Sequence, residues 1–304
     1  MNPRAATFLE SVSLEESRIQ YPQDKIFFCG GKISPDGQFR SLRHYLYDNR
    51  LQAFPTYSVV LAEKAAEQFD SRVYDDLMEF ERYIASISRI VLLVSESPGS
   101  IAELGAFSQI TEISEKLLVF LHSRYYAESS FVKDGPIRYL ERRNEQSVWE
   151  FDWPSQDDNV IPSEQVRLLM PALLDAVRTF ARVQPRTERF RSSRIGHRIL
   201  LVGGVIQLLG CCKLREIAQG LEILEVEFSE TQIKQAIFCL KLFNWVKSVK
   251  RETTYYIYSA PLDPLLFRGT FWNRIFDISR ERMEIMGVYE VDDPRLTAME
   301  TTAV

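Results

Sequence analysis

The stretch that decides the fold is Ile90–Phe107, which reads IVLLVSESPGSIAELGAF. Its first five residues are apolar without alternation, which is typical of a strand buried on both faces of a parallel sheet. Pro, Gly and Ser follow, and a helical pattern comes next, which we expect to open at Ser100 and to run to about Ile110. A buried strand, a polar loop and a helix in this order favour an α/β fold.

The alternation of strand and helix continues on both sides of this stretch. The apolar run Lys25–Cys29 ends at Gly30 and Gly31, as a buried strand followed by a tight turn would. Further elements are expected at residues 41–49 (helix), 57–61 (strand), 74–87 (helix) and 116–121 (strand). The pattern predicts a doubly wound, Rossmann-like parallel sheet in which ligands bind beyond the carboxyl ends of the strands, in the loops 29–32 and 95–100.

The second half of the chain has a different pattern. Three stretches with helical spacing and two that can pair as a hairpin predict a smaller winged helix-turn-helix domain. They are residues 195–210, 214–224, 229–243, 246–249 and 255–258. We therefore divide the chain into a catalytic sheet domain (1–155), a linker helix with an arginine-rich arm (156–194), the winged-helix domain (195–260) and a C-terminal helical tail (261–304).

Basic side chains gather in two places. Seven arginines and one acid lie between Arg178 and Arg198, so this segment is either a solvated linker or an arm that contacts phosphate. Residues 213–252 hold seven basic and six acidic side chains, and this net charge of +1 leaves both nucleic-acid docking and protein docking open. The candidate docking residues are Arg189, Arg191, Arg194, Lys247, Lys250 and Arg251.

The overall composition excludes several classes of protein. With 37 Lys and Arg against 42 Asp and Glu, the net charge of −5 excludes a protein that is basic throughout. The four cysteines show no C-x-x-C pair and the three histidines no metal spacing, so we expect reduced core thiols and no metal site. We find neither a signal peptide nor a membrane span, and expect a cytoplasmic protein.

Glu103 is the candidate catalytic residue, because it follows the loop where such a sheet presents its ligand. Ser100 and Glu103 also match S-x-x-E, which can be a capping box without a catalytic role. In the first turn of a helix the dipole would keep the Glu103 carboxylate ionised, able to attack or stabilise the cationic carbon that forms when an N-glycosidic bond breaks.

Asp76 is the candidate for an assisting acid, among several acids of its helix. Gly30 and Gly31 either form a bare turn or let backbone N–H groups approach a phosphate or ribose.

Three motifs carry a family resemblance: Phe27–Gly31 (FFCGG), Ser97–Phe107 (SPGSIAELGAF) and Gly135–Arg138 (GPIR). Together they resemble the effector proteins of bacterial retrons, which join a nucleoside deoxyribosyltransferase-like domain to a winged-helix domain. The resemblance covers about residues 24–150 by motif and residues 195–260 by pattern. It implies that Glu103 is the nucleophile. It also implies that the substrate-binding loops are those of Cys29, Gly30 and Gly31 and of Ser97, Gly99 and Ser100.

The resemblance also implies a biological role. Such effectors are antiphage toxins that a neighbouring reverse transcriptase and its multicopy single-stranded DNA/RNA hybrid hold inactive, and some of them destroy NAD. No cofactor is implied, because NAD would be the substrate, and self-assembly is expected since related domains commonly complete their sites across subunits.

One departure from the deoxyribosyltransferase pattern bears on the substrate. The aspartate expected before the Pro/Gly loop, which handles the nucleobase, is replaced by Ser95-Glu96. Nicotinamide departs neutral and needs no proton, so this loss hurts NAD hydrolysis less than purine release. Our leading hypothesis is hydrolysis of NAD to nicotinamide and ADP-ribose. The alternatives are a salvage nucleoside 2-deoxyribosyltransferase or nucleosidase, and a nucleotide-sensing winged-helix transcriptional regulator.

Overall fold

The structure is a computed structural model of the chain. It describes all residues except 35, 128, 155–159, 270–275, 291–292 and 303–304. These residues form two compact units, each assembled from separate stretches of sequence. The sheet unit contains residues 24–68 and 88–185, and the winged-helix unit contains residues 1–23, 69–87 and 186–304.

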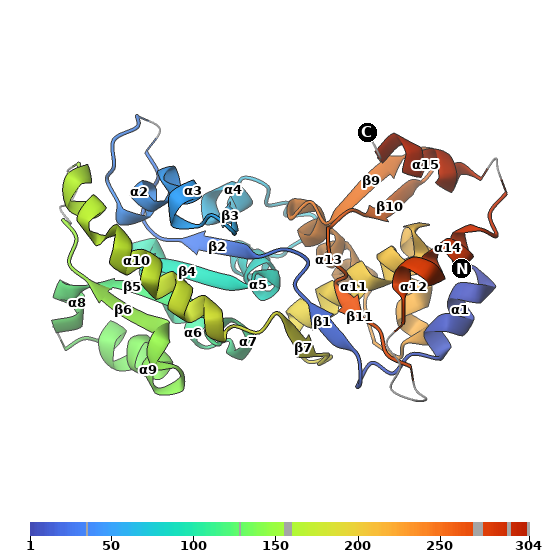
Figure 1. Cartoon of the computed structure of the whole chain (residues 1–304), viewed down its shortest axis with the longest axis horizontal. Helices are drawn as coiled ribbons and strands as arrows, with labels where there is room; N and C mark the ends of the chain where they lie inside the picture. The colour runs from blue at the N-terminus through green and yellow to red at the C-terminus, as the bar shows by residue number, and fades with distance from the viewer. Residues whose placement is uncertain (35, 128, 155–159, 270–275, 291–292, 303–304) are drawn as a thin grey trace. The chain divides into compact units, whose positions relative to one another are not determined.

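A five-stranded parallel sheet forms the centre of the sheet unit (Figure 1). Its order is β3-β2-β4-β5-β6, and each neighbouring pair is parallel. The strands are β2 (Lys25–Cys29), β3 (Ser58–Leu61), β4 (Ile90–Ser95), β5 (Leu117–His122) and β6 (Val148–Phe151). The predicted parallel α/β sheet is confirmed, with the stretch that begins at Ile90 as its middle strand.

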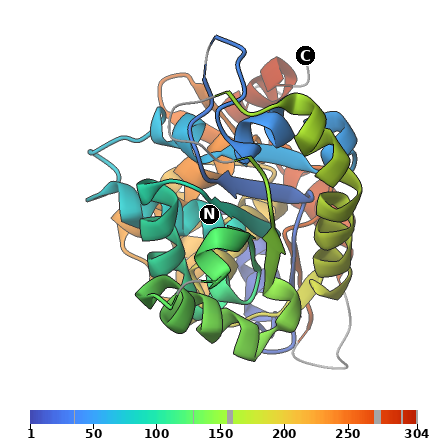
Figure 2. The ribbon, with the colours of Figure 1, turned by 90° about the vertical axis from the view of Figure 1, so that its left-hand side faces the viewer.

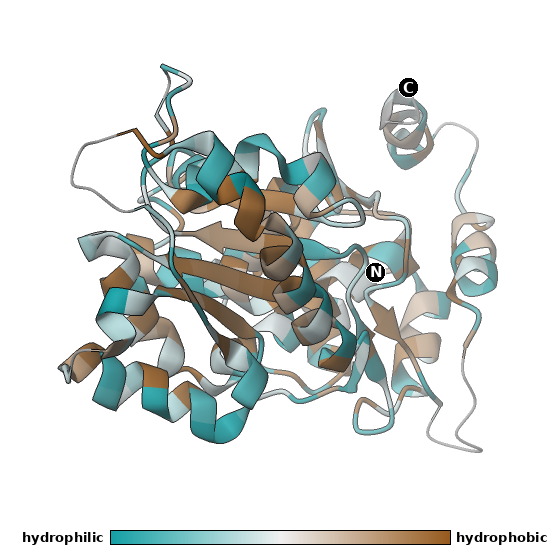
Figure 3. Cartoon of the chain, turned by 60° about the vertical axis from the view of Figure 1, so that its left-hand side comes forward, coloured by the Kyte–Doolittle hydropathy of each residue, from teal (hydrophilic) through white to brown (hydrophobic). Residues whose placement is uncertain are grey.

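Helices cover both faces of this sheet. They are α2 (Leu42–Asp48), α3 (Arg50–Ala53), α4 (Ala62–Ala66), α6 (Pro98–Ser108), α7 (Thr111–Ser114), α8 (Ser123–Ala127), α9 (Arg138–Arg143) and α10 (Ser163–Val183), with short turns η1 (Lys133–Ile137) and η2 (Glu145–Ser147). Figure 2 shows the strands between layers of helices, with α10 in yellow-green on one side. The central strands are hydrophobic along their length (Figure 3), as strands covered on both faces must be.

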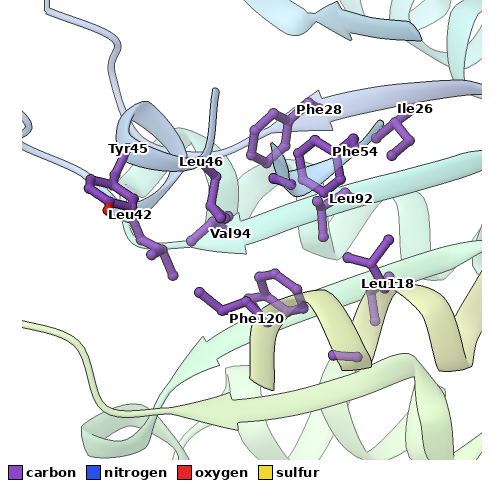
Figure 4. Close-up of a cluster of buried hydrophobic side chains, with 14 of the residues drawn as sticks. Ile26, Phe28, Leu42, Tyr45, Leu46, Phe54, Leu92, Val94, Leu118 and Phe120 are labelled. Carbon is purple, nitrogen blue, oxygen red and sulfur yellow. The ribbon is translucent and has the colours of Figure 1, made fainter. Parts of the chain in front are cut away.

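An apolar core of this unit lies between one face of the sheet and helices α2, α3 and α10. Phe28 of β2 packs edge-to-face on Phe54, with ring centroids 5.9 Å apart, and Leu118 and Phe120 lie on the same face (Figure 4). Helix α10 closes this core with Val166, Leu173, Ala176, Val177 and Phe180. The opposite face contacts α6, where the rings of Phe27 and Phe107 lie 6.3 Å apart.

The winged-helix unit has the element order that the sequence predicted. Its helices are α11 (Ile195–Leu209), α12 (Leu214–Ile223) and α13 (Glu230–Leu242), and the strands β8 (Cys211–Cys212), β9 (Val246–Lys250) and β10 (Thr254–Tyr258) form an antiparallel sheet in the order β8-β10-β9. Helix α11 is buried on all sides, because other elements of the unit surround it. Strand β10 and the turn before it form the wing with β9.

Other segments complete this unit. They are α1 (Pro3–Glu10), α5 (Leu77–Ile87), α14 (Ile278–Met286), α15 (Pro294–Thr302) and a second antiparallel sheet in the order β11-β1-β7, made of β1 (Arg18–Gln20), β7 (Thr187–Arg189) and β11 (Leu265–Leu266). Within the C-terminal helical tail expected over residues 261–304, the first helix among the described residues begins at Ile278. Residues 270–275 of that prediction lie outside the described residues.

The two units do not follow the linear division expected from the sequence. Residues 1–23 and 69–87 belong to the winged-helix unit, although both precede residue 155. Helix α10, expected to be a linker, belongs to the sheet unit because its apolar face closes the core. The arginine-rich segment continues from the end of α10 into strand β7, so its backbone is part of helix and sheet and not a free arm.

Candidate functional site

A pocket of about 510 Å³ opens at the carboxyl edge of the sheet. Four strands deliver a lining residue just after they end: Gly31 follows β2, Glu96 follows β4, Arg124 follows β5 and Trp153 follows β6. The N-terminal turn of α6 supplies further lining residues. The sequence-based expectation that a ligand site forms beyond these strand ends is therefore matched by a cavity in the described structure.

Glu96 is the one carboxylate among the described residues that line this pocket. Its Oε1 accepts N–H bonds from Gly31 and Arg43 at 3.1 Å each, and its Oε2 accepts one from Leu42 at 2.8 Å. Burial raises the pKa of Glu96 to about 7, whereas the three N–H donors and the Arg43 guanidinium act in the opposite direction. The sequence marked Glu96 as a departure from a family pattern, and its place directly after a predicted strand was the signal that it faces the site.

The glycine turn after β2 is shaped by close packing. A Cβ atom on Gly31 would lie 2.7 Å from the Cβ of Ser41 and 2.8 Å from Glu96 Oε1. Gly30 has φ +148°, and a Cβ there would lie 2.8 Å from Arg43 Cδ. Gly31 lines the pocket, but its N–H group donates to Glu96 and is therefore not offered to a phosphate.

Buried Arg43 supports the turn from behind. Its guanidinium donates to the carbonyl groups of Gly31 and Phe28, at 3.0 and 2.7 Å, and forms a two-point ion pair with Glu63. Cys29, the last residue of β2, is fully buried in the sheet and absent from the described lining of the pocket. Cys29 thus contributes to the core. The substrate-binding role that the resemblance implies for Cys29 is not supported by a contact with the cavity.

Helix α6 begins three residues earlier than the sequence indicated. Ser97 is the N-cap, Pro98 occupies the first turn, and Ser97 and Ser100 form the capping box. The Ser100 hydroxyl also accepts the N–H of Glu96 at 3.1 Å, which ties the cap to the pocket carboxylate. The expected box between Ser100 and Glu103 is wrong, because Pro98 and the Ser97 side chain already fix the helix start.

Glu103 consequently lies in the second turn of α6, beyond the reach of the dipole effect assumed for the first turn. It is half-buried, and its Oε2 is shielded from solvent. The described pocket lining includes Ser97, Pro98 and Ile101 but not Glu103. Two residues correspond to about 200° around a helix, so Glu103 and Ile101 face different sides of α6.

Three basic side chains surround the pocket: Lys32, Arg40 and Arg124, all exposed. Arg40 pairs with Asp36 at 2.8 Å, and Arg124 donates to the Tyr125 hydroxyl at 2.6 Å. Sequence reasoning named none of the three, although Lys32 and Arg124 each follow the end of a strand within three residues. Their shared charge makes the mouth of the pocket favourable for an anion.

The apolar walls of the pocket come from aromatic and aliphatic residues. Trp153 is 2% exposed, and its carbonyl accepts a hydrogen bond of 2.7 Å from Nε2 of His122 at the end of β5. Tyr125, Ile101 and Ile161 complete these walls. A pocket with apolar walls and a few convergent polar groups has the usual composition of a small-molecule site.

Asp76 lies outside the sheet unit. It belongs to the stretch 69–87 of the winged-helix unit, where its Oδ1 accepts the N–H of Glu79 at 2.7 Å at the start of α5. This contact gives Asp76 a capping role that is independent of Glu103.

The candidate docking residues also have local partners. Arg189 pairs with Glu16 at 2.9 Å, Arg194 pairs with Glu188 at 2.8 Å, and Arg251 donates to the Thr301 hydroxyl at 3.0 Å. Arg191, Lys247 and Lys250 are exposed. The structure thus leaves basic side chains on the wing and beside β7, but it does not gather them into one continuous arm.

Two further findings concern metal ions and membranes. Within the described residues no group of three or more His, Cys, Asp and Glu side chains is placed to hold a metal ion. Among the helices in the described part of the chain, none is long and apolar enough to cross a membrane.

Comparison with known proteins connects these features to a family. A family model described as the STM3845 retron effector protein matches residues 40–248. Two curated proteins of Escherichia coli, whose names propose ribosyltransferase and DNA-binding roles, are also similar. The retron Ec86 protein is 32% identical over 127 residues, which are 40% of this chain and 39% of that protein. The retron Ec73 protein is 26% identical over 147 residues, which are 47% of this chain and 46% of that protein.

This chain therefore spans less than half the length of the curated relatives that it matches. The family model, in contrast, runs from α2 across the sheet unit and into strand β9 of the wing, and so includes more than half of the chain. A match that extends over both the parallel sheet and the winged helix establishes that the chain belongs to the STM3845 retron effector family.

Proposed function

We propose that this retron effector cleaves an N-glycosidic bond of a nucleotide, most simply that of NAD. The observation that carries the proposal is the pocket at the carboxyl ends of β2, β4, β5 and β6, which is bordered by the first turn of α6. The relatives' names, which refer to ribosyl transfer, support the same bond. The reaction would consume NAD and water and release nicotinamide, ADP-ribose and a proton.

The charges at the pocket support a phosphorylated substrate over a neutral nucleoside. Lys32, Arg40 and Arg124 lie around the opening, and guanidinium groups bind phosphate oxygens in a two-point geometry. Trp153 and Tyr125 offer apolar surface for an aromatic ring. A free deoxynucleoside carries no phosphate and would use only the apolar surface for its base. The basic side chains at the opening therefore count against a salvage deoxyribosyltransferase.

Two carboxylates can serve the chemistry. By family resemblance Glu103 attacks C1′ of the ribose as the nicotinamide bond breaks, and water then resolves the ribosyl–enzyme ester. Glu96 lies at the pocket itself and holds the glycine turn and the start of α2 in place. Because Glu103 is outside the described lining, this assignment requires substrate binding to bring α6 and the sugar together.

Restraint by the retron partners completes the proposal. The neighbouring reverse transcriptase and its DNA/RNA hybrid would dock on the basic side chains of the wing and the β7 region and keep the toxin inactive in the cytoplasm until infection. Assembly of several copies would finish the site. The relatives' names, which include DNA binding, support nucleic acid as part of this partner.

The test measures total NAD in cells that express the wild type, Glu103→Gln or Glu96→Gln, each with and without the reverse transcriptase and its nucleic acid. Glu145→Gln, the same change at an exposed acid of η2, is the matched control. We expect NAD to fall with the wild type and the control, to hold steady with Glu103→Gln, and to recover when the partners are present.

Other outcomes would redirect or remove the proposal. Growth arrest that requires Glu103 while NAD holds steady would assign another nucleotide as the substrate. Depletion of NAD by Glu103→Gln but not by Glu96→Gln would move the nucleophile to the pocket carboxylate. Unchanged depletion in both variants would refute a glycosidase at this site and favour the sensing regulator.

A further inference from the structure

A groove of about 840 Å³ runs along the helix-turn-helix of the winged-helix unit. It lies between α12, the turn after it and the start of α13. Its apolar floor consists of Ala218, Leu221, Val226 and Ile233, of which the last three are buried. In DNA-binding proteins of this fold, the same turn and the first residues of the second helix approach the phosphates and the base edges.

The rim of this groove is acidic. Glu222, Glu225 and Glu227 are all exposed along it. Arg198 is the one basic residue among the described lining residues, and it is engaged locally: it donates to the Glu227 carbonyl at 2.5 Å and to Gln232 Oε1 at 3.2 Å. The groove therefore presents net negative charge, which repels a phosphate backbone.

One side of α13 is covered by residues 69–87 of the chain itself. Gln235, 5% exposed, accepts the Tyr83 hydroxyl at 2.9 Å and donates to the Val73 carbonyl at 3.0 Å. The Tyr74 hydroxyl donates to the Gln235 carbonyl at 2.7 Å. Phe238 packs edge-to-face against Tyr74 and Phe80, with centroid distances of 5.8 and 5.7 Å.

These contacts come from residues 69–87, which belong to the same compact unit as α13. A helix must present a free face to enter the major groove of DNA. Residues 69–87 therefore cover one side of the C-terminal half of α13, while Lys234 and Lys241 remain exposed on another side, and the N-terminal half continues into the acidic groove. The covered side narrows the surface that α13 can offer to DNA, and the acidic groove beside it repels a phosphate backbone.

We infer that the helix-turn-helix face of this unit is a protein-docking face, whose groove takes a basic, amphipathic polypeptide segment from a partner protein. Charge complementarity selects Lys or Arg side chains for the rim, and the floor of Ala218, Leu221, Val226 and Ile233 accepts apolar ones. The adjoining contact between α13 and residues 69–87 shows that this helix already binds a helical segment. The inference does not depend on the proposed N-glycosidase activity.

The experiment uses the full chain and two probes. One is a synthetic helical peptide of about 15 residues with Lys on one face and Leu on the other, a length that fills a groove between helices. The other is a duplex DNA of random sequence. Binding is followed by fluorescence anisotropy at low and at physiological ionic strength, since exposed charges are screened differently in the two conditions.

Two groove variants separate charge from volume. Glu222→Lys with Glu227→Lys reverses the rim, and Ala218→Trp fills the floor without changing charge. The matched control, Glu145→Lys with Glu150→Lys, reverses two exposed acids of the sheet unit. Thermal melting confirms that each variant is folded.

We expect the peptide to bind the wild type and the control alike, and both groove variants to weaken it about tenfold or more, the usual effect of losing a charged or packed contact at an interface. Equal peptide binding by wild type and groove variants would overturn the inference. It would also be overturned if Lys234→Glu with Lys241→Glu, on the exposed side of α13, abolished duplex binding, because α13 would then read DNA.

Discussion

Glu96 is a single residue whose protonation should affect the stability of the fold. Burial raises its pKa from 4.5 to about 7, so the folded chain keeps a proton between these values that the unfolded chain has lost. The free energy of unfolding should therefore fall as pH rises from about 4.5 to 7, by up to about 3 kcal/mol at 1.36 kcal/mol for each pKa unit. Glu96→Gln, which cannot ionise, should flatten this slope although it weakens the N–H bonds at every pH.

Urea unfolding of the wild type and Glu96→Gln at several pH values in this window measures the effect. Other titrating groups are common to both proteins and cancel in the difference. If the free energies of unfolding of the two proteins changed with pH in parallel, the pKa of Glu96 would have the ordinary value for a carboxyl group and burial would not raise it.

Gly31 is a second residue at which one substitution should change stability. A Cβ atom added at Gly31 would lie 2.7 Å from the Cβ of Ser41 and 2.8 Å from Oε1 of Glu96. Gly31→Ala must therefore displace the start of α2 or the pocket carboxylate. We expect a loss of about 1–3 kcal/mol in the free energy of unfolding, as for other overpacked sites. Gly99→Ala is the control, because the nearest atom to its Cβ is Ser97 Oγ at 3.9 Å and Ala favours a helix.

Chemical denaturation of the two alanine variants measures the loss in the free energy of unfolding. If the loss were as large for Gly99→Ala as for Gly31→Ala, the lost backbone freedom of glycine would explain it, and close packing at Gly31 would not.

Much of the pocket was predictable residue by residue, and the exceptions have a physical cause. The loops of Gly31 and Glu96 were expected at the site because they follow buried strands, and the same rule applied to β5 would have added Arg124. The position of Glu103 relative to the pocket was not predictable, because it depends on the residue at which α6 starts. A shift of three residues moves a side chain from the first helical turn to the second.

At the scale of elements, the capping of α6 can be tested directly. Ser100 is buried, and its hydroxyl accepts the N–H groups of Glu96 and Ser97 at 3.1 and 2.9 Å. Ser100→Ala should lower the free energy of unfolding by about 1–3 kcal/mol, because it leaves these donors unsatisfied. Ser97→Ala should lower it by about 1 kcal/mol through loss of the N-cap.

Hydrogen exchange of the first amides of α6 and urea unfolding together report on this cap. Glu103→Gln should leave both measurements near the wild-type values. A large increase in exchange for Glu103→Gln, with none for Ser97→Ala, would restore the capping box that the sequence alone indicated.

Elements with strong local patterns were predictable, and those defined by distant partners were not. Strands β2, β4 and β5 are buried along their whole length and apolar at all but one position each, and the winged helix follows from its order of helices and hairpin. Strand β6 escaped notice because only one of its residues is buried, which leaves little hydrophobic signal. The sheet β11-β1-β7 joins segments nearly 250 residues apart, a pairing that no local pattern encodes.

At the scale of the whole molecule, compact units and linear segments of sequence do not coincide. Residues 69–87 lie between β3 and β4 in the chain, yet they pack in the winged-helix unit. Amphipathic spacing predicted the helix correctly, but periodicity specifies only that one face is buried and not which partner buries it. The same reasoning applies to α10, whose apolar face closes a core that begins about 140 residues earlier.

The dependence of the sheet unit on α10 leads to a prediction about fragments. Val166, Leu173, Ala176, Val177 and Phe180 are buried against the sheet, and large apolar side chains contribute about 1.5–3 kcal/mol each when buried. The four larger ones, Val166, Leu173, Val177 and Phe180, together contribute about 6–12 kcal/mol, which is comparable with the entire stability of a typical domain, about 5–15 kcal/mol. The fragment 1–155 should therefore lack a cooperative thermal transition and near-ultraviolet circular dichroism, whereas the fragment 1–185 should show both. Both fragments keep residues 1–23 and 69–87 of the winged-helix unit and lack residues 186–304, so their difference isolates residues 156–185, which include α10. Cooperative melting of fragment 1–155 near the midpoint of fragment 1–185 would mean that the five strands and their remaining helices form a complete core without it.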